Sequence, residues 1–168
     1  MTSTMPSNRT NTDFDFLIGN WKVHHRRLID RLANCTEWIE FEGTCAAQKI
    51  LDGQGNMDDN VLFLPEGPYR AAAMRCFDPE SQTWAIWWLD ARFPKGPVDP
   101  PMVGKFTDGE GLFLADETFK GRPIRVRFRW IDTKSKNPRW EQAFSEDGGA
   151  TWETNWTMVF TRDLPRGK

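Results

Sequence analysis

Apolar and polar residues alternate along most of this chain, which is the pattern of a β-strand with one buried face. The stretch 84–88 carries Trp or Ile at every second position, and the stretch 124–130 repeats this arrangement. Clusters of Gly, Pro, Asn and Asp recur about every 10 to 15 residues and end each run. The runs predict about ten strands, near 20–32, 36–51, 57–64, 69–77, 82–90, 102–106, 110–119, 122–131, 138–145 and 152–162.

Short connections between successive runs predict an antiparallel meander, and no helical run of ten or more residues remains to cover a sheet face. We therefore expect an all-β, up-and-down barrel of about ten strands, because closure hides one face and both edges of the sheet. Phe14–Ile18 predicts one short helical turn, which Gly19 ends. The expected organisation is a flexible tail over 1–13, a single barrel domain over 14–163 with a proline-rich rim loop over 91–101, and a C-terminal tail over 164–168.

Composition excludes several classes of protein. The chain has 168 residues and a net charge of -2 with a pI near 5.7, so its charge does not favour binding of nucleic acid. Its apolar runs are far shorter than the roughly 20 residues of a membrane helix, and the polar segment 1–13 does not resemble a signal peptide. Three cysteines without CxxC spacing predict neither disulfides nor a zinc site, so we expect no metal, no cofactor and a cytoplasmic location.

The segment Phe16–Val23 contains a Gly-x-Trp motif, formed by Gly19 and Trp21, directly after the predicted helical turn. This segment resembles the opening of calycin barrels, the group that holds lipocalins and fatty-acid-binding proteins. The resemblance implies that Trp21 closes one end of the barrel and that a cationic side chain from the last strand packs across its ring. Arg162 stands at the corresponding place and shares the parity of the apolar residues before it.

The whole chain is similar to an uncharacterised bacterial family of single-domain, calycin-like proteins, which has no assigned activity. Fatty-acid-binding proteins insert a two-helix lid after their first strand, whereas Asp30–Asn34 leaves room here for a hairpin only. The haem-binding relative nitrobindin has further glycines after its Trp, whereas the segment 22–25 here reads Lys-Val-His-His. The resemblance therefore implies a barrel and indicates no particular ligand.

Residues 145–152, which read Ser-Glu-Asp-Gly-Gly-Ala-Thr-Trp, match the Asp-box hairpin found repeatedly in sialidases. The motif occurs once here, and a sialidase propeller needs several four-stranded blades, so glycosidase activity does not follow. We expect a structural turn in which Asp147 accepts hydrogen bonds from amides, the glycines take positive φ and Trp152 clamps the hairpin.

His24 and His25 are the only histidines in the chain. Adjacent strand residues point to opposite faces, so the two cannot bind one metal ion from a regular strand. Parity with Trp21 places His25 inside the barrel. There it is a candidate acid or base for an isomerase or cyclase, or it contacts a carboxylate such as Glu40 or Glu42.

Arg125, Arg127 and Arg129 alternate with an apolar row on one predicted strand. We expect the apolar row inside the barrel and the arginines outside, next to acidic residues of neighbouring strands. The alternative places the arginines inside, where an anion such as a fatty acid or a phosphate ester would have to neutralise them, because an unpaired buried charge is costly.

Nine Trp and twelve Phe residues supply more aromatic material than ordinary packing needs. In a barrel of ten strands these side chains either fill the lumen or line a cavity. A filled lumen would indicate a structural barrel, in which a homodimer covers Trp87 on the outer face. At the rim, Asp90, Arg92 and Asp99 either orient a ligand or anchor the loop. Our main expectation is a small hydrophobic or aromatic ligand held by Trp38, Trp84, Trp88, Phe128, Trp130, Trp140, Trp156 and Met158.

Overall fold

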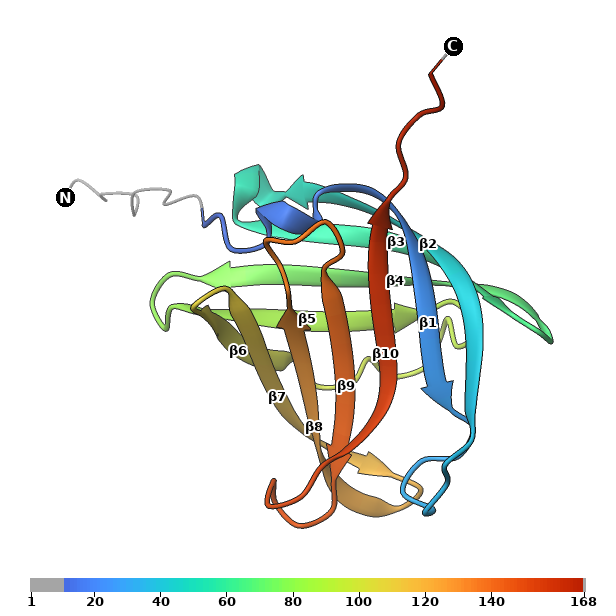
Figure 1. Cartoon of the computed structure of the whole chain (residues 1–168). Helices are drawn as coiled ribbons and strands as arrows, with labels where there is room; N and C mark the ends of the chain where they lie inside the picture. The colour runs from blue at the N-terminus through green and yellow to red at the C-terminus, as the bar shows by residue number, and fades with distance from the viewer. Residues whose placement is uncertain (1–10, 168) are drawn as a thin grey trace.

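The alternating runs form ten antiparallel strands that close into one barrel, as a computed structural model describing residues 11–167 shows (Figure 1). The all-β barrel expected from the sequence is therefore confirmed. Its elements are η1 (Asp15–Leu17), β1 (Gly19–Leu28), β2 (Trp38–Ile50), η2 (Leu51–Gly53), β3 (Gly55–Leu64), β4 (Gly67–Asp78), β5 (Thr83–Asp90), β6 (Met102–Thr107), β7 (Glu110–Phe119), β8 (Arg122–Ile131), β9 (Arg139–Ser145) and β10 (Glu153–Arg162).

Each strand pairs with its neighbours in sequence, and β10 closes the barrel against β1 with Trp21 opposite Arg162. Closure pairs the two edges that an open sheet would leave exposed. Because successive strands are antiparallel, all odd-numbered strands run toward the same end of the barrel. The two ends of the barrel are therefore lined by different residues, and their side chains pack differently.

The end of the barrel where β1 begins is plugged by η1 and by the rings next to it. Phe14 packs edge-on against Trp84 with 4.9 Å between ring centroids, and Leu17 is fully buried. The Trp21 indole donates a hydrogen bond to the Leu17 carbonyl at 2.8 Å. Arg162 lies 3.8 Å over the Trp21 ring and donates to two backbone carbonyls of the η1 segment. The structure thus brings together the two residues that the calycin resemblance pairs.

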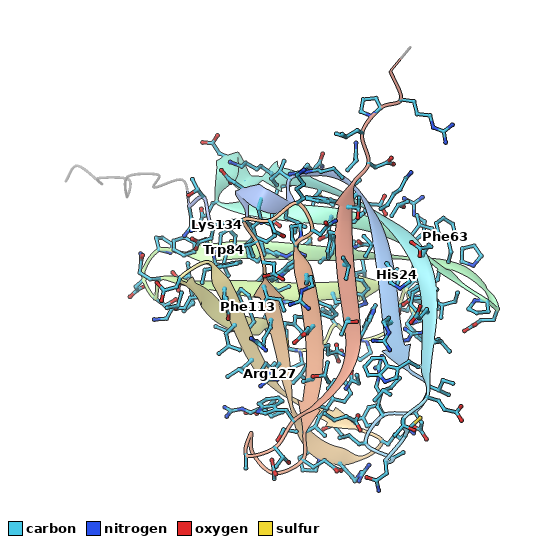
Figure 2. All side chains as sticks on the ribbon, in the orientation of Figure 1. His24, Phe63, Trp84, Phe113, Arg127 and Lys134 are labelled. Atoms are coloured by element: carbon cyan, nitrogen blue, oxygen red, sulfur yellow. The ribbon has the colours of Figure 1, made fainter. Side chains whose placement is uncertain are left out.

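Alternation along β8 places its apolar row inside the barrel and its arginine row outside (Figure 2). Arg125 lies 3.4 Å from Asp116, and Arg129 lies 3.6 Å from acidic side chains of both neighbouring strands. Arg127 packs over the ring of Trp152 at 4.4 Å. The arginines therefore have partners on the outer surface, and an anion in the lumen is not needed to neutralise them.

Residues 145–152 form the connection between β9 and β10 and are held by their own hydrogen bonds. Asp147 accepts from the hydroxyl and the amide of Thr151, and Ser145 Oγ donates to Asp147 at 2.7 Å. These bonds lower the pKa of Asp147 to about 2, because the ionised carboxylate accepts them. Gly149 has a φ of 98° and accepts a hydrogen bond from the Trp152 indole. The motif acts as a turn, as expected.

The strand bounds differ from the prediction mainly at β1, which ends at Leu28 rather than near residue 32. Leu32 and Asn34 take positive φ in the connection 29–37, and such turn conformations cannot continue a strand. This connection contains no helix, so it forms no two-helix lid over the barrel. The alternation pattern also does not predict η2, which directly follows β2.

Residues 1–10 and 168, which the sequence assigns to tails, lie outside the described residues. Asp13 was assigned to the same N-terminal tail, but its carboxylate accepts a hydrogen bond from Trp84 Nε1 at 3.1 Å. The contacts of the barrel therefore include the last residue of that segment. No helix within residues 11–167 is both long and apolar enough to cross a membrane.

Candidate functional site

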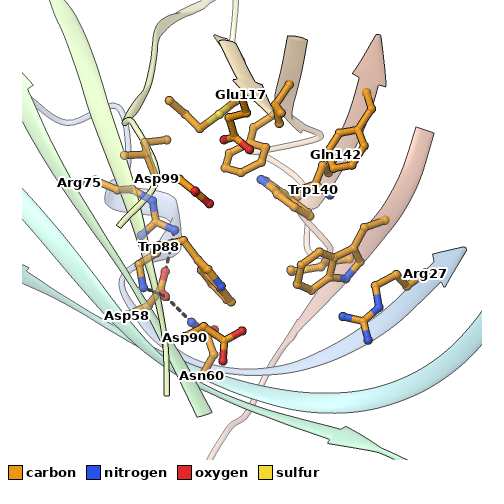
Figure 3. Close-up of a pocket in the computed structure, with 18 of the residues that line it drawn as sticks. Arg27, Asp58, Asn60, Arg75, Trp88, Asp90, Asp99, Glu117, Trp140 and Gln142 are labelled. Atoms are coloured by element: carbon orange, nitrogen blue, oxygen red, sulfur yellow. Dashed lines mark hydrogen bonds and ion pairs between the residues drawn. The ribbon is translucent and has the colours of Figure 1, made fainter. Parts of the chain in front are cut away.

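A cavity of about 350 Å³ lies inside the barrel, away from the end that Trp21 and η1 plug (Figure 3). Its outer residues come from the ends of β1, β5 and β7, which all run toward the same end of the barrel. Small-molecule sites measure about 300 to 1,000 Å³, so this volume suits a small organic ligand.

Six of the eight predicted ligand-binding residues line the cavity. Side chains alternate between the two faces of β2, and Trp38 points outward, where Arg26 lies 5.0 Å from its ring. The prediction that Trp38 lines the lumen is therefore wrong. Trp84 faces inward but lies at the plugged end, where its side chain is 2% exposed and packs against Phe14. Trp84 therefore does not line the cavity, contrary to the prediction. The six that line the cavity are Trp88, Phe128, Trp130, Trp140, Trp156 and Met158.

The aromatic side chains of the cavity form a wall of nearly perpendicular rings. The Trp156 ring lies 5.4 Å from Trp140 and 6.2 Å from Trp88, with interplanar angles of 87° and 89°. Phe128 lies 4.8 Å from Trp140 at 62°. Edge-to-face contacts of this kind are favourable, so the rings hold one another in place. The wall suits a flat, apolar ligand.

His25 lies inside the barrel, as expected, but it does not line the cavity. Its ring stacks on Phe41 at 4.7 Å, and its Nδ1 accepts a hydrogen bond from Trp156 Nε1 at 3.2 Å. Burial, followed by the charges of Arg27 and His24, lowers the pKa of His25 from 6.5 to about 3. The imidazole is therefore neutral at pH 7 and supports a wall residue rather than touching a ligand.

The expected contact of His25 with Glu40 or Glu42 is wrong. Both carboxylates belong to the outward row of β2, where they lie 3.4 Å and 2.6 Å from the ring of His24. The physical reason is parity, because residues on the same face of paired strands meet, and His24 rather than His25 shares the face of these carboxylates.

The inner faces of β3 and β4 add a polar wall to the cavity. Asp58 and Arg75 form an ion pair at 2.6 Å, and their side chains are 4% and 6% exposed. Asp58 also accepts from the Asn60 amide and from the Ala73 N–H, while Arg75 donates to Asn56 Oδ1 at 2.9 Å. These bonds compensate two charges that would be costly to bury alone.

Two arginines at the edge of the cavity have no carboxylate within ion-pair distance among residues 11–167. Arg27 lies near the end of β1, and Arg31 follows in the connection to β2. Arg27 lies 5.3 Å from the Trp156 ring and Arg31 lies 5.5 Å from the Phe144 ring. Neither forms an ion pair with any carboxylate of residues 11–167. Burial and then the charge of Arg27 lower the pKa of Arg31 to about 10, so Arg31 remains positive at pH 7.

Glu117 and Asp99 place two carboxylates at another side of the cavity (Figure 3). Glu117 is an inward residue of β7, and Asp99 belongs to the rim loop. Burial, followed by the charge of Asp99, raises the pKa of Glu117 from 4.5 to about 7. A group with this pKa can give or take a proton at neutral pH. Acid or base chemistry on a ligand in this cavity would therefore involve Glu117 rather than His25.

Asp90 and Arg92 fix the start of the rim loop. Arg92 donates to Asp90 from Nη2 at 2.7 Å and from its backbone N–H at 2.9 Å. Its guanidinium also lies 3.7 Å from the Tyr69 ring. Loop anchoring was one of the two expected roles, and these contacts support it for Asp90 and Arg92, while Asp99 lies beside Glu117.

The three cysteines are free thiols. Cys45 lines the cavity, and burial, more than the nearby carboxylates, raises its pKa well above the usual value, so it is a neutral wall residue. Within the described part of the chain, no three His, Cys, Asp or Glu side chains are placed together to hold a metal ion.

Comparison with known proteins gives a likeness of fold. The sequence matches no family model and no curated protein. Among solved structures, the S-type phycobiliprotein lyase from Guillardia theta has a similar fold, with a TM-score of 0.61 over 91% of this chain and 92% of that chain. Sequence identity is 9%, so the likeness concerns the fold alone. It agrees with the calycin-like barrel and gives no support to a particular bacterial family.

The polar residues of the cavity were not predicted, although strand alternation places some of them inside the barrel. Glu117 shares the parity of the buried Phe113, and Asp58 shares that of the buried Leu62. Inward acidic residues in a strand are unusual and indicate either an internal partner or a ligand. No periodicity could place Arg31, because it lies in a connection.

Proposed function

We propose that this protein binds a small, largely aromatic molecule with an acidic group in the lumen of its barrel. The observation that carries the proposal is the cavity of about 350 Å³, walled by tryptophans and bordered by Arg27 and Arg31, which have no carboxylate within ion-pair distance among residues 11–167. Apolar burial contributes about 25 cal/mol per Å², and a guanidinium holds an acidic group through paired, charge-assisted hydrogen bonds. The free cysteines favour a reducing, cytoplasmic location for this binding.

The likeness of fold supports this proposal in a general way. The neighbour is named a phycobiliprotein lyase, and the structural match covers 91% of this chain and 92% of that chain. Folds host many functions, so the specific ligand has to come from the site itself. For this chain the site combines flat apolar surface with positive charge, and we propose the ligand class from that combination.

The test of lumenal binding uses 8-anilinonaphthalene-1-sulfonate, an aromatic sulfonate whose emission increases in apolar surroundings. We expect saturable binding with one site per chain and quenching of tryptophan emission. Ala73→Phe inserts a ring into the cavity and should abolish binding, whereas Ala72→Phe, on the outer face of the same strand, should not. Binding that persists unchanged in Ala73→Phe, or no saturable binding at all, contradicts the proposal.

The test of the acidic group compares two neighbouring arginines on opposite faces of β1. Arg27→Met removes the charge at the cavity, and Arg26→Met removes one that faces solvent beside Glu40. Loss of a hydrogen bond to a charged group costs about 1.5–3 kcal/mol, or roughly a 10- to 150-fold increase in Kd for the sulfonate. N-phenyl-1-naphthylamine lacks the sulfonate and should bind both variants equally. An equal loss for both probes contradicts the assignment of Arg27.

A second candidate function is self-association through the outer sheet. Met74, Leu89, Val103 and Leu112 are each about half exposed on the outer faces of β4 to β7, and Met74 pairs across the sheet with Trp87. Exposed apolar patches often mark interfaces. Sedimentation velocity over a range of protein concentrations should show a dimer that Leu89→Lys dissociates, whereas a monomer at every concentration excludes this function.

A further inference from the structure

The charged residues that face the cavity fall into compensated pairs and uncompensated groups. Arg75 is paired with Asp58, and Arg92 with Asp90, so these four side chains carry no net charge into the lumen. The uncompensated groups are of two signs and come from different elements, with Arg27 and Arg31 from β1 and the connection after it, and Glu117 and Asp99 from β7 and the rim loop.

Arg27 and the carboxyl groups of Glu117 and Asp99 approach the cavity from different sides, whereas Arg31 packs on Phe144, whose ring lies 5.4 Å from that of Phe119 on the strand of Glu117. Figure 3 shows the Glu117 and Asp99 carboxyl groups at one side of the cavity and the Arg27 guanidinium at another, with the Trp140 ring between Glu117 and Arg27 and the Asp90 carboxylate on the side of Arg27. None of these groups lies within ion-pair distance of an opposite charge of residues 11–167, although Arg27 acts electrostatically on Asp90 and Glu153 acts on Arg31. The cavity therefore holds the Arg27 guanidinium and the carboxyl groups of Glu117 and Asp99 at different sides, with Trp140 between Glu117 and Arg27.

Among residues 11–167, the charged neighbour that acts on Glu117 is a carboxyl group and not a cation. Across the sheet it pairs with Ile124 of β8, and the inward residues of β6 are Met102, Gly104 and Phe106. The charged group that acts on it is Asp99, which has the same sign. A carboxylate in apolar surroundings beside a second carboxylate is stabilised by a proton or by a cationic group of a ligand.

We propose that the cavity selects planar ligands with charge at both ends, whose acidic group is bound by Arg27 and whose protonated amine is bound by Glu117 and Asp99. This inference rests on the lumenal binding proposed above and specifies its ligand class as aromatic amino acids of the ω-amino type, in which ring atoms separate the two charges. Binding of the amine displaces the proton that Glu117 otherwise retains, so affinity for such ligands depends on pH.

The size of the pH effect follows from the titration of Glu117. With a pKa of about 7, Glu117 is ionised in roughly one tenth of molecules at pH 6 and in roughly nine tenths at pH 8. The affinity for an amine that requires the ionised form should therefore rise about tenfold from pH 6 to pH 8.

Two matched pairs of probes test the proposal by isothermal titration calorimetry. In each pair a methyl group replaces the aminomethyl group at the end opposite the acid. The pairs are 6-(aminomethyl)-2-naphthoic acid with 6-methyl-2-naphthoic acid, and the shorter 4-(aminomethyl)benzoic acid with 4-methylbenzoic acid. In at least one pair we expect the amino acid to bind about tenfold tighter than its methyl analogue at pH 8 and to lose this advantage at pH 6.

Glu117→Gln should abolish the preference for the amine in that pair and the pH dependence with it. The matched control is Asp116→Asn, which removes the adjacent, outward carboxylate of the same strand and should leave both intact. Equal affinities within both pairs for the unmodified protein, or a preference that survives in Glu117→Gln, overturn this inference while lumenal binding stands. If no acid of either pair binds, this inference fails, and lumenal binding is then decided separately by the 8-anilinonaphthalene-1-sulfonate test.

Discussion

Replacing Glu117 with Gln is expected to stabilise the protein at pH 8 and to leave its stability at pH 4 unchanged. The folded state raises the pKa of Glu117 from 4.5 to about 7, so it holds a proton that the unfolded chain releases at lower pH. The favourable contribution of the protonated carboxyl is complete below about pH 4.5 and is lost as the pH rises through 7. Gln resembles the protonated carboxyl at every pH, so the variant keeps this favourable contribution as the pH rises.

The size of the effect is set by the pKa difference and by solvent. A change from 4.5 to about 7 corresponds to at most about 3 kcal/mol for a fully buried group. Glu117 lies in a cavity that opens to solvent and is itself partly exposed, so screening reduces this to about 1–2 kcal/mol. The variant should therefore gain about 1–2 kcal/mol of unfolding free energy at pH 8 and almost nothing at pH 4.

Urea unfolding followed by tryptophan fluorescence at pH 4, 6 and 8 measures this difference. Other groups that titrate over the same range, including the buried His25, act equally on both proteins and cancel when the two are compared. Asp116→Asn on the outer face of β7 is the control and should show no gain that depends on pH. A gain of the same size at pH 4 and pH 8, or a loss at pH 8, would refute the reasoning about burial and the charge of Asp99.

Three further variants test the framework around the cavity. Asp58→Asn leaves Arg75 buried without its partner and should lower the unfolding free energy by about 3–5 kcal/mol, which thermal or urea unfolding measures; a loss below about 1 kcal/mol would contradict it. Arg162→Ala removes the cation over Trp21 and two hydrogen bonds to carbonyls, with an expected cost of about 1–3 kcal/mol, and Arg162→Lys should recover only part of it. Asp147→Ala should increase hydrogen exchange at the amides of its turn, while unchanged protection there would show that its hydrogen bonds are dispensable.

The barrel could be predicted because the side chains of every strand alternate between the inside and the outside of the barrel over most of its length. The row of β8 that ends in Trp130 faces inward, with Phe128 partly buried and its other members buried, and the absence of a long helix left closure as the way to cover it. The residues at which strands end could not be predicted from this alternation. Arg31 follows an alternating run, but the positive φ of Leu32 and the pairing of β1 with β2 stop the strand at Leu28.

The aromatic wall could be predicted only in part, because parity states which face a residue takes and not how deep in the barrel it lies. Trp84 and Trp88 share a face of β5 and are separated by four residues, which corresponds to about 13 Å along a strand. Trp84 meets Phe14 at the plugged end, whereas Trp88 lines the cavity. The plug comes from η1, a segment far away in sequence, so no local pattern separates the two tryptophans.

Whether an inward charge is compensated depends on strand register, and this decides which charges remain for a ligand. Arg75 faces Asn56 across β3 and has Asp58 two residues further along the same face, so its charge is neutralised inside the protein. Arg27 pairs with Ile39 on one side and with Trp156 on the other, and neither strand supplies a carboxylate there. The sequence contains both arginines at inward positions, but only the closed barrel distinguishes a structural ion pair from a positive charge that a ligand can use.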